Sequence, residues 1–241
     1  MKKNIIILLL LTVSNCIYAQ EVKVNNISKV IYKRSVYQDL EIKSKNPDVN
    51  KIGKHVSEII KELEFELLFN TNSSIYHIVP NLKLEESPFY KLVAGTESIY
   101  YRKVDTKEFL KNVQTLGTPI NVIMDYNKYN WIITKETKMF GEYKCYKATA
   151  IYKEFNPIHK SVSTFTPIVW FTPEIPVPFG PEGLDGLPGL VLEASLNGQT
   201  YYYASKIEIN KYNNKDYTIE KPNAKSLSED KYAKILNDRF N

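Results

Sequence analysis

Four carboxylates are the residues of this sequence whose types and spacing come nearest to a chemical site: Glu174, Glu182, Asp185 and Glu193. Paired carboxylates can exchange protons with a substrate or bind a hard cation. In a stretch rich in proline and glycine, however, they more often keep a loop soluble or accept hydrogen bonds from its backbone. A hydrolase or a metal-binding protein is therefore the alternative hypothesis and not the preferred one.

The three histidines do not add to such a site. His55, His77 and His159 are far apart along the chain, and the sequence has no HExxH motif, nucleophile elbow or clustered metal-ligand spacing. We identify no catalytic residue, no metal ligand and no cofactor from the sequence. Enzyme activity is the less favoured hypothesis.

Cysteine chemistry has one candidate, Cys145. It is the only cysteine beyond Cys16, so removal of the N-terminal segment would exclude an intramolecular disulfide. Cys145 could be a packed, inert side chain or a reactive thiol. We favour packing because no histidine or second cysteine lies nearby in the sequence to activate it.

The N-terminus has the pattern of a signal peptide. Two lysines precede an apolar run from Ile5 to Val13, which is much shorter than the roughly 20 residues of a membrane-spanning helix. A polar stretch and then Ala19 follow, as at a cleavage site. We expect residues 1–19 to be removed and residues 20–241 to form a single mainly-β domain in the periplasm or cell envelope.

Lipidation of Cys16 is the alternative, and it would anchor the protein instead of releasing it. Asn15 argues against lipidation, because the residue before a lipidated cysteine is usually small. No later stretch has the length of an apolar membrane span, so an integral membrane protein is not expected.

The charge pattern excludes one class of partner. The formal net charge of +5 is small for 241 residues, and two of the lysines lie in the expected signal peptide. Basic residues are interleaved with acidic ones, and no lysine or arginine stripe could follow a phosphate backbone. Nucleic acid is therefore not an expected partner.

Most of the chain alternates apolar and polar residues and is rich in tyrosine, isoleucine, valine and threonine, which predicts antiparallel strands. We expect a mainly β (α+β) fold, with a curved antiparallel sheet or half-barrel and one or two helices. The strands should cover residues 22–36, 63–70, 74–79, 97–104, 120–124, 130–135, 142–152, 161–171, 190–196 and 200–209. Polar turns should join the second to the third, the fifth to the sixth and, by a tight I′ turn at Asn197-Gly198, the last two.

Helical periodicity is clear in residues 47–62 and in residues 226–240. The second of these begins with the capping pattern Ser226-Leu227-Ser228-Glu229. A short third helix is expected over residues 105–113, because Asp105 and Glu108 resemble a cap.

The tyrosine run at residues 201–203 allows two interpretations. It could be a ligand platform, or a strand that packs on both faces. Tyr201 and Tyr203 alternate in step with Ile207 and Ile209 and should share their face, while Tyr202 should lie on the opposite face with Lys206 and Glu208. We favour packing.

The most distinctive segment is the proline- and glycine-rich stretch 170–193. Its prolines fix φ and remove backbone donors, so it should be an extended crossing or a sheet edge. Its four glycines permit positive φ, while its leucines supply apolar anchors. We expect a rigid packed loop that re-enters a strand. Its structural or binding role should fall on these residues: Trp170, Gly180, Pro181, Gly186, Leu187, Pro188, Gly189 and Leu190.

This segment resembles the GLPGLI family of exported Bacteroidetes proteins. The motif is present as Gly186-Leu187-Pro188-Gly189-Leu190, with Val191 in place of the final isoleucine. The similarity extends upstream through residues 170–176 and 141–148 to Trp131. The resemblance implies an exported, mainly β protein of a family without an established biochemical role, and it implies no mechanism.

The preferred hypothesis is a non-catalytic binding or assembly module. A curved sheet could offer a concave apolar face to a lipid, a peptide or an envelope protein. An enzyme would instead bring several carboxylates or histidines together in one cleft. A purely structural protein would have neither feature.

Overall fold

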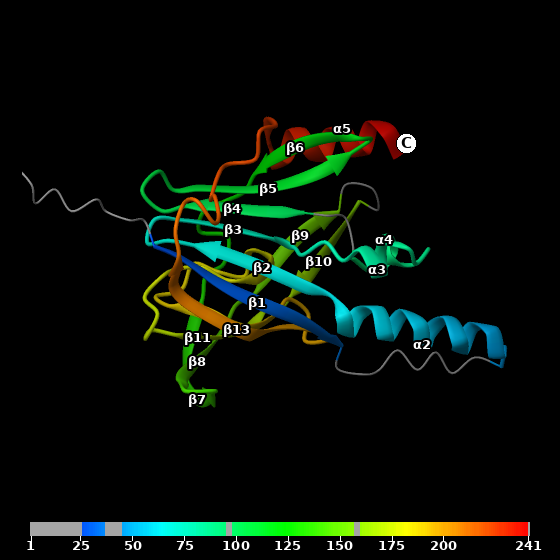
Figure 1. Cartoon of the computed structure of the whole chain (residues 1–241). Coiled ribbons are helices and arrows are strands. Elements are labelled where there is room, and N and C mark those ends of the chain that lie inside the picture. Colours follow the sequence, from blue (N-terminus) through cyan, green and yellow to red (C-terminus); the bar gives the residue numbers. More distant parts are fainter. Residues whose placement is uncertain (1–25, 37–44, 95–97, 157–159, 241) are drawn as a thin grey trace, which may run out of the picture.

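The computed structural model describes residues 26–36, 45–94, 98–156 and 160–240. The expected signal peptide, its cleavage site and Cys16 lie outside these residues, as does His159. Within them, twelve strands form one open sheet and two more form a separate hairpin (Figure 1). The mainly β fold predicted from the sequence is confirmed.

One half of the large sheet is built from the N-terminal strands, which are β1 (Ile27–Val36), β2 (Glu64–Phe69), β3 (Ser73–Ile78), β4 (Ile99–Lys103), β5 (Glu108–Thr115) and β6 (Thr118–Ile123). The other half contains β7 (Ile132–Phe140), β8 (Tyr143–Thr149), β11 (Ile168–Thr172), β12 (Leu190–Ser195) and β13 (Thr200–Tyr212). The short β14 (Lys225–Ser228) completes it, and β9 (Tyr152–Asn156) and β10 (Ser161–Phe165) form the separate hairpin.

The strand order is β14-β6-β5-β4-β3-β2-β1-β13-β12-β11-β8-β7. Only the edge pair β14–β6 is parallel among the described pairs, and the others are antiparallel. Strands β4 to β6 run across the view in Figure 1 while β8 and β11 run nearly upright. The sheet therefore twists strongly from one end to the other, as the predicted curvature requires.

The β2–β3 hairpin follows the alternation in the sequence. Its core-facing side chains at positions 63, 65, 67 and 69 are all buried, and Phe65 stands opposite Ile78. Asn70 closes the turn, because its side-chain oxygen accepts hydrogen bonds from the backbone N–H groups of Asn72 and Ser73. This hairpin is confirmed.

The chain between β6 and β7 does not form the expected hairpin. Asp125 accepts a hydrogen bond from the N–H of Asn127, as in a local turn. The two strands on either side of this turn nevertheless lie near opposite ends of the sheet order. The polar turn is real, but it starts a crossing from one half of the sheet to the other.

The helix over residues 47–62 is confirmed as α2 (Pro47–Glu62). Asn46 caps it by accepting a hydrogen bond from the N–H of Asp48, and Pro47 suits the first turn. Its C-terminal half packs on the core, through Ile59 and Ile60 and the partly buried Val56. Two short helices follow β3, α3 (Leu82–Glu85) and α4 (Tyr90–Ala94).

The C-terminal helix begins later than predicted. Residues 225–228 form the edge strand β14, and α5 (Glu229–Phe240) starts after Ser228, whose hydroxyl accepts from the N–H of Lys231. The cap is therefore Ser228 and not Ser226. No helix within the described ranges is long and apolar enough to cross a membrane.

The predicted helix over residues 105–113 is wrong, because this segment enters β5. Both faces of β5 are covered: Phe109 and Val113 are buried, and so are Leu110 and Asn112. The amide of Asn112 donates to Asn121 on β6 at 2.8 Å, which fixes it inside the sheet. A strand buried on both sides shows no simple alternation.

Other strands differ from prediction in their limits. The first strand is described from Ile27, the segment 142–152 ends with the start of β9, and the segment 161–171 is divided into β10 and β11. The β12–β13 pairing is confirmed. Its connection is not a type I′ turn, because only Gly198 has positive φ there, while Asn197 accepts hydrogen bonds from the N–H groups of Gln199 and Thr200.

The tyrosine strand has an irregularity that reverses its faces. Ala204 stands opposite Tyr32 and Lys206 opposite Ile31, so Ser205 is an extra residue. Tyr202 therefore points to the core, 5.3 Å from the ring of Phe65, on the same side as Ile207 and Ile209. The expectation that Tyr201 and Tyr203 share the face of those isoleucines is wrong.

Candidate functional site

The signature loop folds back on itself between β11 and β12. Leu190 donates its N–H to Ile175 at 2.9 Å, and Gly186 donates to Pro178 at 3.1 Å. Leu187 and Leu190 are buried. Pro181 starts the 3-10 turn η1 (Pro181–Gly183), while Gly186 and Pro188 are exposed. The loop is packed, as the sequence predicts.

Its glycines serve two different purposes. Gly183 and Gly186 have φ of +70° and +87°, a conformation that favours glycine. At Gly180 and Gly189 φ is not positive, and the reason for glycine is space. A Cβ would lie 2.5 Å from the carbonyl oxygen of Leu184 at Gly180, and 2.3 Å from that of Thr172 at Gly189. The freedom to take positive φ is therefore used at Gly183 and Gly186 and not at these two.

Trp170 lies on β11 between two charged neighbours. It stands opposite Lys147 on β8 and Glu193 on β12. The ammonium of Lys138 lies 4.5 Å from its ring centroid and 2.7 Å from a carboxylate oxygen of Glu193. These contacts tie β7 to the middle of this half of the sheet, which is a structural role.

The four carboxylates near the signature loop do not converge on one site. Glu174 accepts a hydrogen bond from the N–H of Lys144, and Glu193 pairs with Lys138. Asp185 pairs with Arg102, and Glu182 accepts a hydrogen bond from Tyr100. Over the described ranges, no group of three or more histidine, cysteine, aspartate or glutamate side chains could hold a metal ion.

Asp185 joins the loop to the N-terminal half of the sheet. Its carboxylate lies 3.4 Å from the guanidinium of Arg102, which is 3% exposed. The Arg102 guanidinium lies 4.7 Å from the ring of Phe109 and 4.0 Å from that of Tyr126, and it donates to the Tyr126 carbonyl. Burial raises the pKa of Asp185 to about 6 despite this cation.

Glu182 lies beside a cluster of tyrosines. Its backbone has φ of +54°, and its carboxylate accepts a hydrogen bond from the hydroxyl of Tyr100 at 3.3 Å. Burial raises the pKa of Glu182, although Lys111 and the Tyr100 hydroxyl act in the opposite direction. The hydroxyl of Tyr76, a residue only 1% exposed, has no hydrogen-bond partner among the described residues.

The described histidines and the cysteine form no site. His55 contacts Ser87 at 3.1 Å, and His77 lies 3.5 Å from Glu66. Cys145 is fully buried in the main core, where burial raises the pKa of its thiol to about 11. A packed and inert thiol is the interpretation that this geometry supports.

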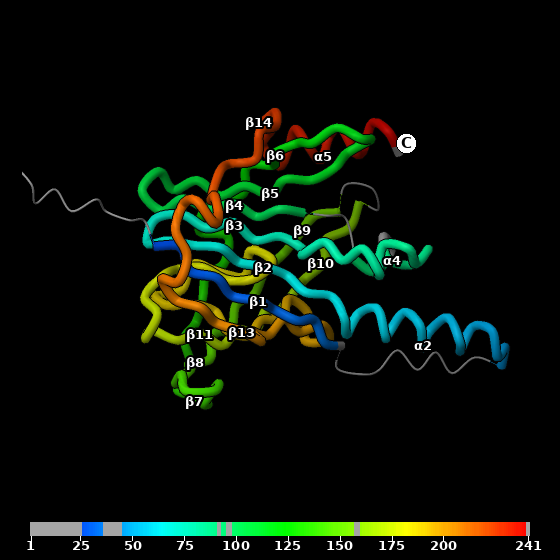
Figure 2. The backbone as a smooth tube through the Cα atoms, viewed as in Figure 1, coloured from blue at the N-terminus to red at the C-terminus, as the bar shows by residue number. Residues whose placement is uncertain are grey.

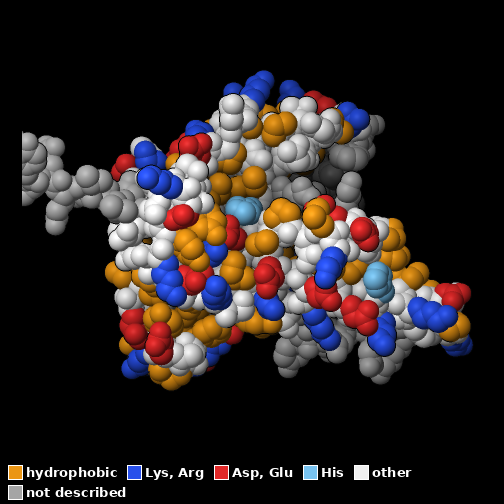
Figure 3. All heavy atoms as spheres, in the orientation of Figure 1, with side chains coloured by type: hydrophobic (Ala, Val, Ile, Leu, Met, Phe, Trp, Pro, Cys, Tyr) orange, Lys and Arg blue, Asp and Glu red, His pale blue; other side chains and the backbone are white. Residues whose placement is uncertain are grey.

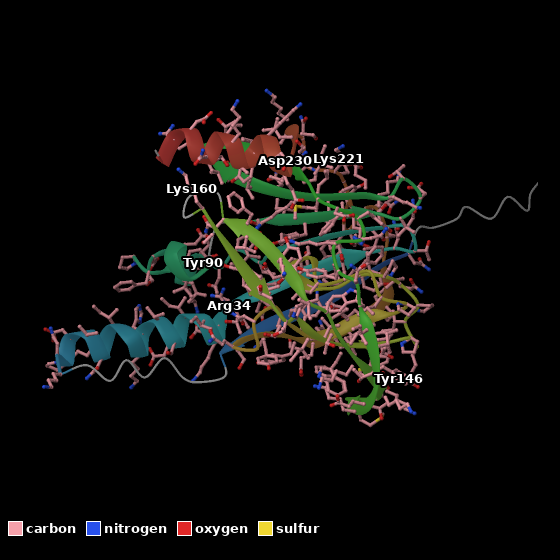
Figure 4. All side chains as sticks on the ribbon, turned by 180° about the vertical axis from the view of Figure 1, so that it is seen from behind. Arg34, Tyr90, Tyr146, Lys160, Lys221 and Asp230 are labelled. Carbon is pink, nitrogen blue, oxygen red and sulfur yellow. The ribbon has the colours of Figure 1, made fainter. Side chains whose placement is uncertain are left out.

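A cavity of about 450 Å³ lies between the sheet, the β9–β10 hairpin and α5. Figure 4 shows the hairpin crossing the rear face of the sheet below α5, with Asp230 near the start of that helix. Its apolar wall comes from β5, β6 and one face of α5, through these residues: Val113, Val122, Met124, Ala233 and Leu236. Its aromatic residues are Tyr100, Tyr152, Phe155 and Tyr232.

Six charged side chains also line this cavity, three of each sign: Lys111, Lys128, Lys153, Glu154, Glu229 and Asp230. None of them forms a salt bridge with another described residue. The ammonium of Lys128 lies 4.5 Å from the ring of Tyr152. Burial lowers the pKa of the half-buried Lys128 and raises that of Glu229, although Glu229 remains exposed to solvent and the opposite charges of the two groups favour their ionised forms.

A second hollow, of about 540 Å³, lies around the β4–β5 turn. It is a shallow surface depression, crossed by the ion pair between Lys221 and Glu108. The face in Figure 3 has positive and negative side chains interspersed, without a large patch of one sign. The cavity beside α5 is therefore the better candidate for a functional site.

The sequence did not reveal this cavity. Its residues come from β4, β5, β6, the loop after β6, β9 and α5, and no local motif connects them. The one signal was the run Tyr152 to Phe155, which places aromatic, basic and acidic side chains in four consecutive positions.

Comparisons with known proteins extend this description. A family described as a protein of unknown function (Porph_ging) matches residues 131–193, which include the motif at residues 186–190. A search of curated proteins found no match.

Two solved structures of PNGF-II are similar in fold. For the structure in space group C2, the TM-score is 0.56 and the sequence identity is 17%, and the match covers 87% of this chain and 32% of that chain. For the structure in space group P21, the TM-score is 0.55 and the sequence identity is 16%, and the match covers 88% of this chain and 33% of that chain. This chain spans about a third of the length of those structures. It thus shares a fold with part of PNGF-II and a segment with a family of unknown function.

Proposed function

We propose that this protein is a non-catalytic binding module and that the cavity beside α5 binds a peptide segment of a partner. The observation that carries the proposal is the set of charges of both signs, joined by no salt bridge among the described residues, around one partly apolar cavity. Lys111 and Lys128 are half-buried and the other four charged side chains are exposed, so they can take charged partners from a ligand. A ligand with an apolar part and both charge signs would supply them.

A peptide fits this lining better than a lipid. A lipid tail needs only apolar contacts, whereas here six charged groups surround the apolar wall. The cavity volume lies in the range of sites for small ligands, so it suits one or two side chains of a longer segment. Phe155 is 58% exposed at the rim, and a bound segment would cover it.

The hydrolase or metal-binding alternative has less support. It requires carboxylates near the signature loop to act together, but Asp185 and Glu193 have separate cationic partners, and Glu174 bonds to a backbone amide. The fold similarity is consistent with a module, because it matches only part of a longer chain.

A cavity-filling substitution tests the peptide-binding role. Ala233 lines the cavity, whereas Lys234, the next residue, is exposed and does not. Peptides selected from a displayed library should bind the wild-type chain and Lys234→Trp equally in calorimetry. Ala233→Trp should lose affinity by about tenfold or more. Equal binding by both variants, each with a melting curve like that of wild type, would reject the cavity as the site.

We also propose that the chain is exported to the periplasm or cell envelope and that it belongs to the GLPGLI family. The support is the N-terminal pattern and the motif at residues 186–190. Mass spectrometry of the protein purified from its own cells should find Gln20 as the first residue. A lipid-modified Cys16 would instead show an anchored protein, and an intact N-terminus would contradict export by this signal.

A further inference from the structure

The cavity runs along an edge of β9 that pairs with no other strand in the described part of the chain. It is lined by four consecutive residues of β9, from Tyr152 to Phe155. Because side chains alternate between the two faces of a strand, a cavity against one face would touch only every second residue. β10, on the other side of β9, contributes no lining residue. The cavity therefore follows the edge of β9 that faces away from β10.

The backbone of this edge is available for pairing. In an antiparallel pair, half of the N–H and C=O groups of each strand point away from its partner. β9 pairs only with β10 among the described strands, and no backbone hydrogen bond joins Tyr152–Phe155 to another described segment. Proteins usually cover such edges or protect them, because they pair readily with another chain.

We infer that the cavity binds its peptide in extended form, as a third strand added to the β9 edge. This inference rests on the peptide-binding function proposed above and adds the mode of binding. Backbone hydrogen bonds to residues 152–155 would hold the peptide, and alternate side chains would point toward the sheet or away from it. The peptide would lie between β9 and the face of α5 that carries Tyr232 and Leu236.

The lining also indicates which peptide would be selected. Val113 and Val122 offer an apolar surface to one central side chain. Lys111 comes from β5 and Lys128 from the loop after β6, and Glu229 comes from the first turn of α5. A segment with an acidic residue on one side of an apolar residue and a basic residue on the other would bring each charge near its opposite.

Backbone methylation of the peptide tests this mode. A peptide of about five to seven residues, selected on the full chain and rejected by Ala233→Trp, is synthesised with an N-methyl group at each position in turn. Strand addition predicts a period of two: methylation at alternate positions lowers affinity about tenfold or more, and methylation between them changes it little. Amide exchange at residues 152–155 should slow in the complex.

The outcomes separate the two proposals. A peptide that Ala233→Trp rejects, but that tolerates methylation at every position and leaves exchange in β9 unchanged, overturns strand addition and leaves the binding function intact. If no peptide distinguishes Ala233→Trp from Lys234→Trp, the binding function is wrong and strand addition is wrong with it.

Discussion

Gly189 should be the glycine of the signature loop that tolerates a methyl group least. A Cβ at this position would lie 2.3 Å from the carbonyl oxygen of Thr172, 2.6 Å from its carbonyl carbon and 2.8 Å from the nitrogen of Pro173. An ordinary contact begins at 3.4 Å, so the loop and the end of β11 must separate by about 1 Å. All three atoms belong to the backbone, and no side chain can turn aside.

The cost follows from what this separation disturbs. Overpacking costs about 1–3 kcal/mol, and we expect the upper end because the backbone itself must move. The hydrogen bond from Leu190 to Ile175, at 2.9 Å, would also lengthen. Gly189→Ala should therefore lower the free energy of unfolding by about 3 kcal/mol. In a chain of this size that corresponds to a fall of roughly 6–12 °C in melting temperature.

Gly141→Ala is the matched control. Its φ is +59°, and nothing lies within 4 Å of an added Cβ, so only the left-handed backbone is penalised, by about 1–2 kcal/mol. Thermal melts followed by circular dichroism, with urea titrations, measure both variants. If Gly189→Ala melts close to wild type, or costs less than Gly141→Ala, then close packing against Thr172 is not the reason for this glycine.

Two further predictions concern buried titratable groups. Burial raises the pKa of Asp185 from 3.8 to about 6, so its contribution to stability is present below pH 3.8 and is lost as the pH rises through 6. Asp185→Asn should remove this pH dependence, which is worth about 3 kcal/mol. Urea titrations at several pH values between 4 and 6 give the free energy of unfolding as a function of pH, and the same dependence on pH in both proteins would contradict the prediction. Cys145 is fully buried and the pKa of its thiol is raised to about 11, so iodoacetamide should label it only at the rate of unfolding. Rapid labelling of the native protein at pH 8 would show an accessible thiol instead.

The sequence was sufficient to predict those elements whose limits are set by residues within or next to the element itself. The bounds of α2 follow from Asn46 as a cap, Pro47 in the first turn and apolar residues on one face. The β2–β3 hairpin follows from alternation and a polar turn. In both cases the residues that decide the structure are close together in the sequence.

The wrong predictions concern segments whose structure depends on residues far apart in the sequence. Asp105 and Glu108 looked like a helix cap, but β4 and β6 pair with both edges of β5 and the chain joins the sheet. The extra residue at Ser205 reverses the faces of β13, and alternation alone does not reveal such an insertion. The cavity depends on the position of β9 and α5 against the sheet, which no short pattern encodes.

The position of β1 has a consequence for the order in which the chain can fold. β1 lies in the middle of the sheet, between β2 and β13 (Figure 2). Its first partner follows within a few tens of residues, but Ile27 stands opposite Tyr212, near the other end of the sequence. During synthesis one edge of β1 must stay unpaired until the chain has been made through β13. Closing so distant a contact is slow, and an open apolar edge can aggregate in the meantime. We therefore expect folding to be limited by the arrival of β13, with the nascent chain dependent on a chaperone until then.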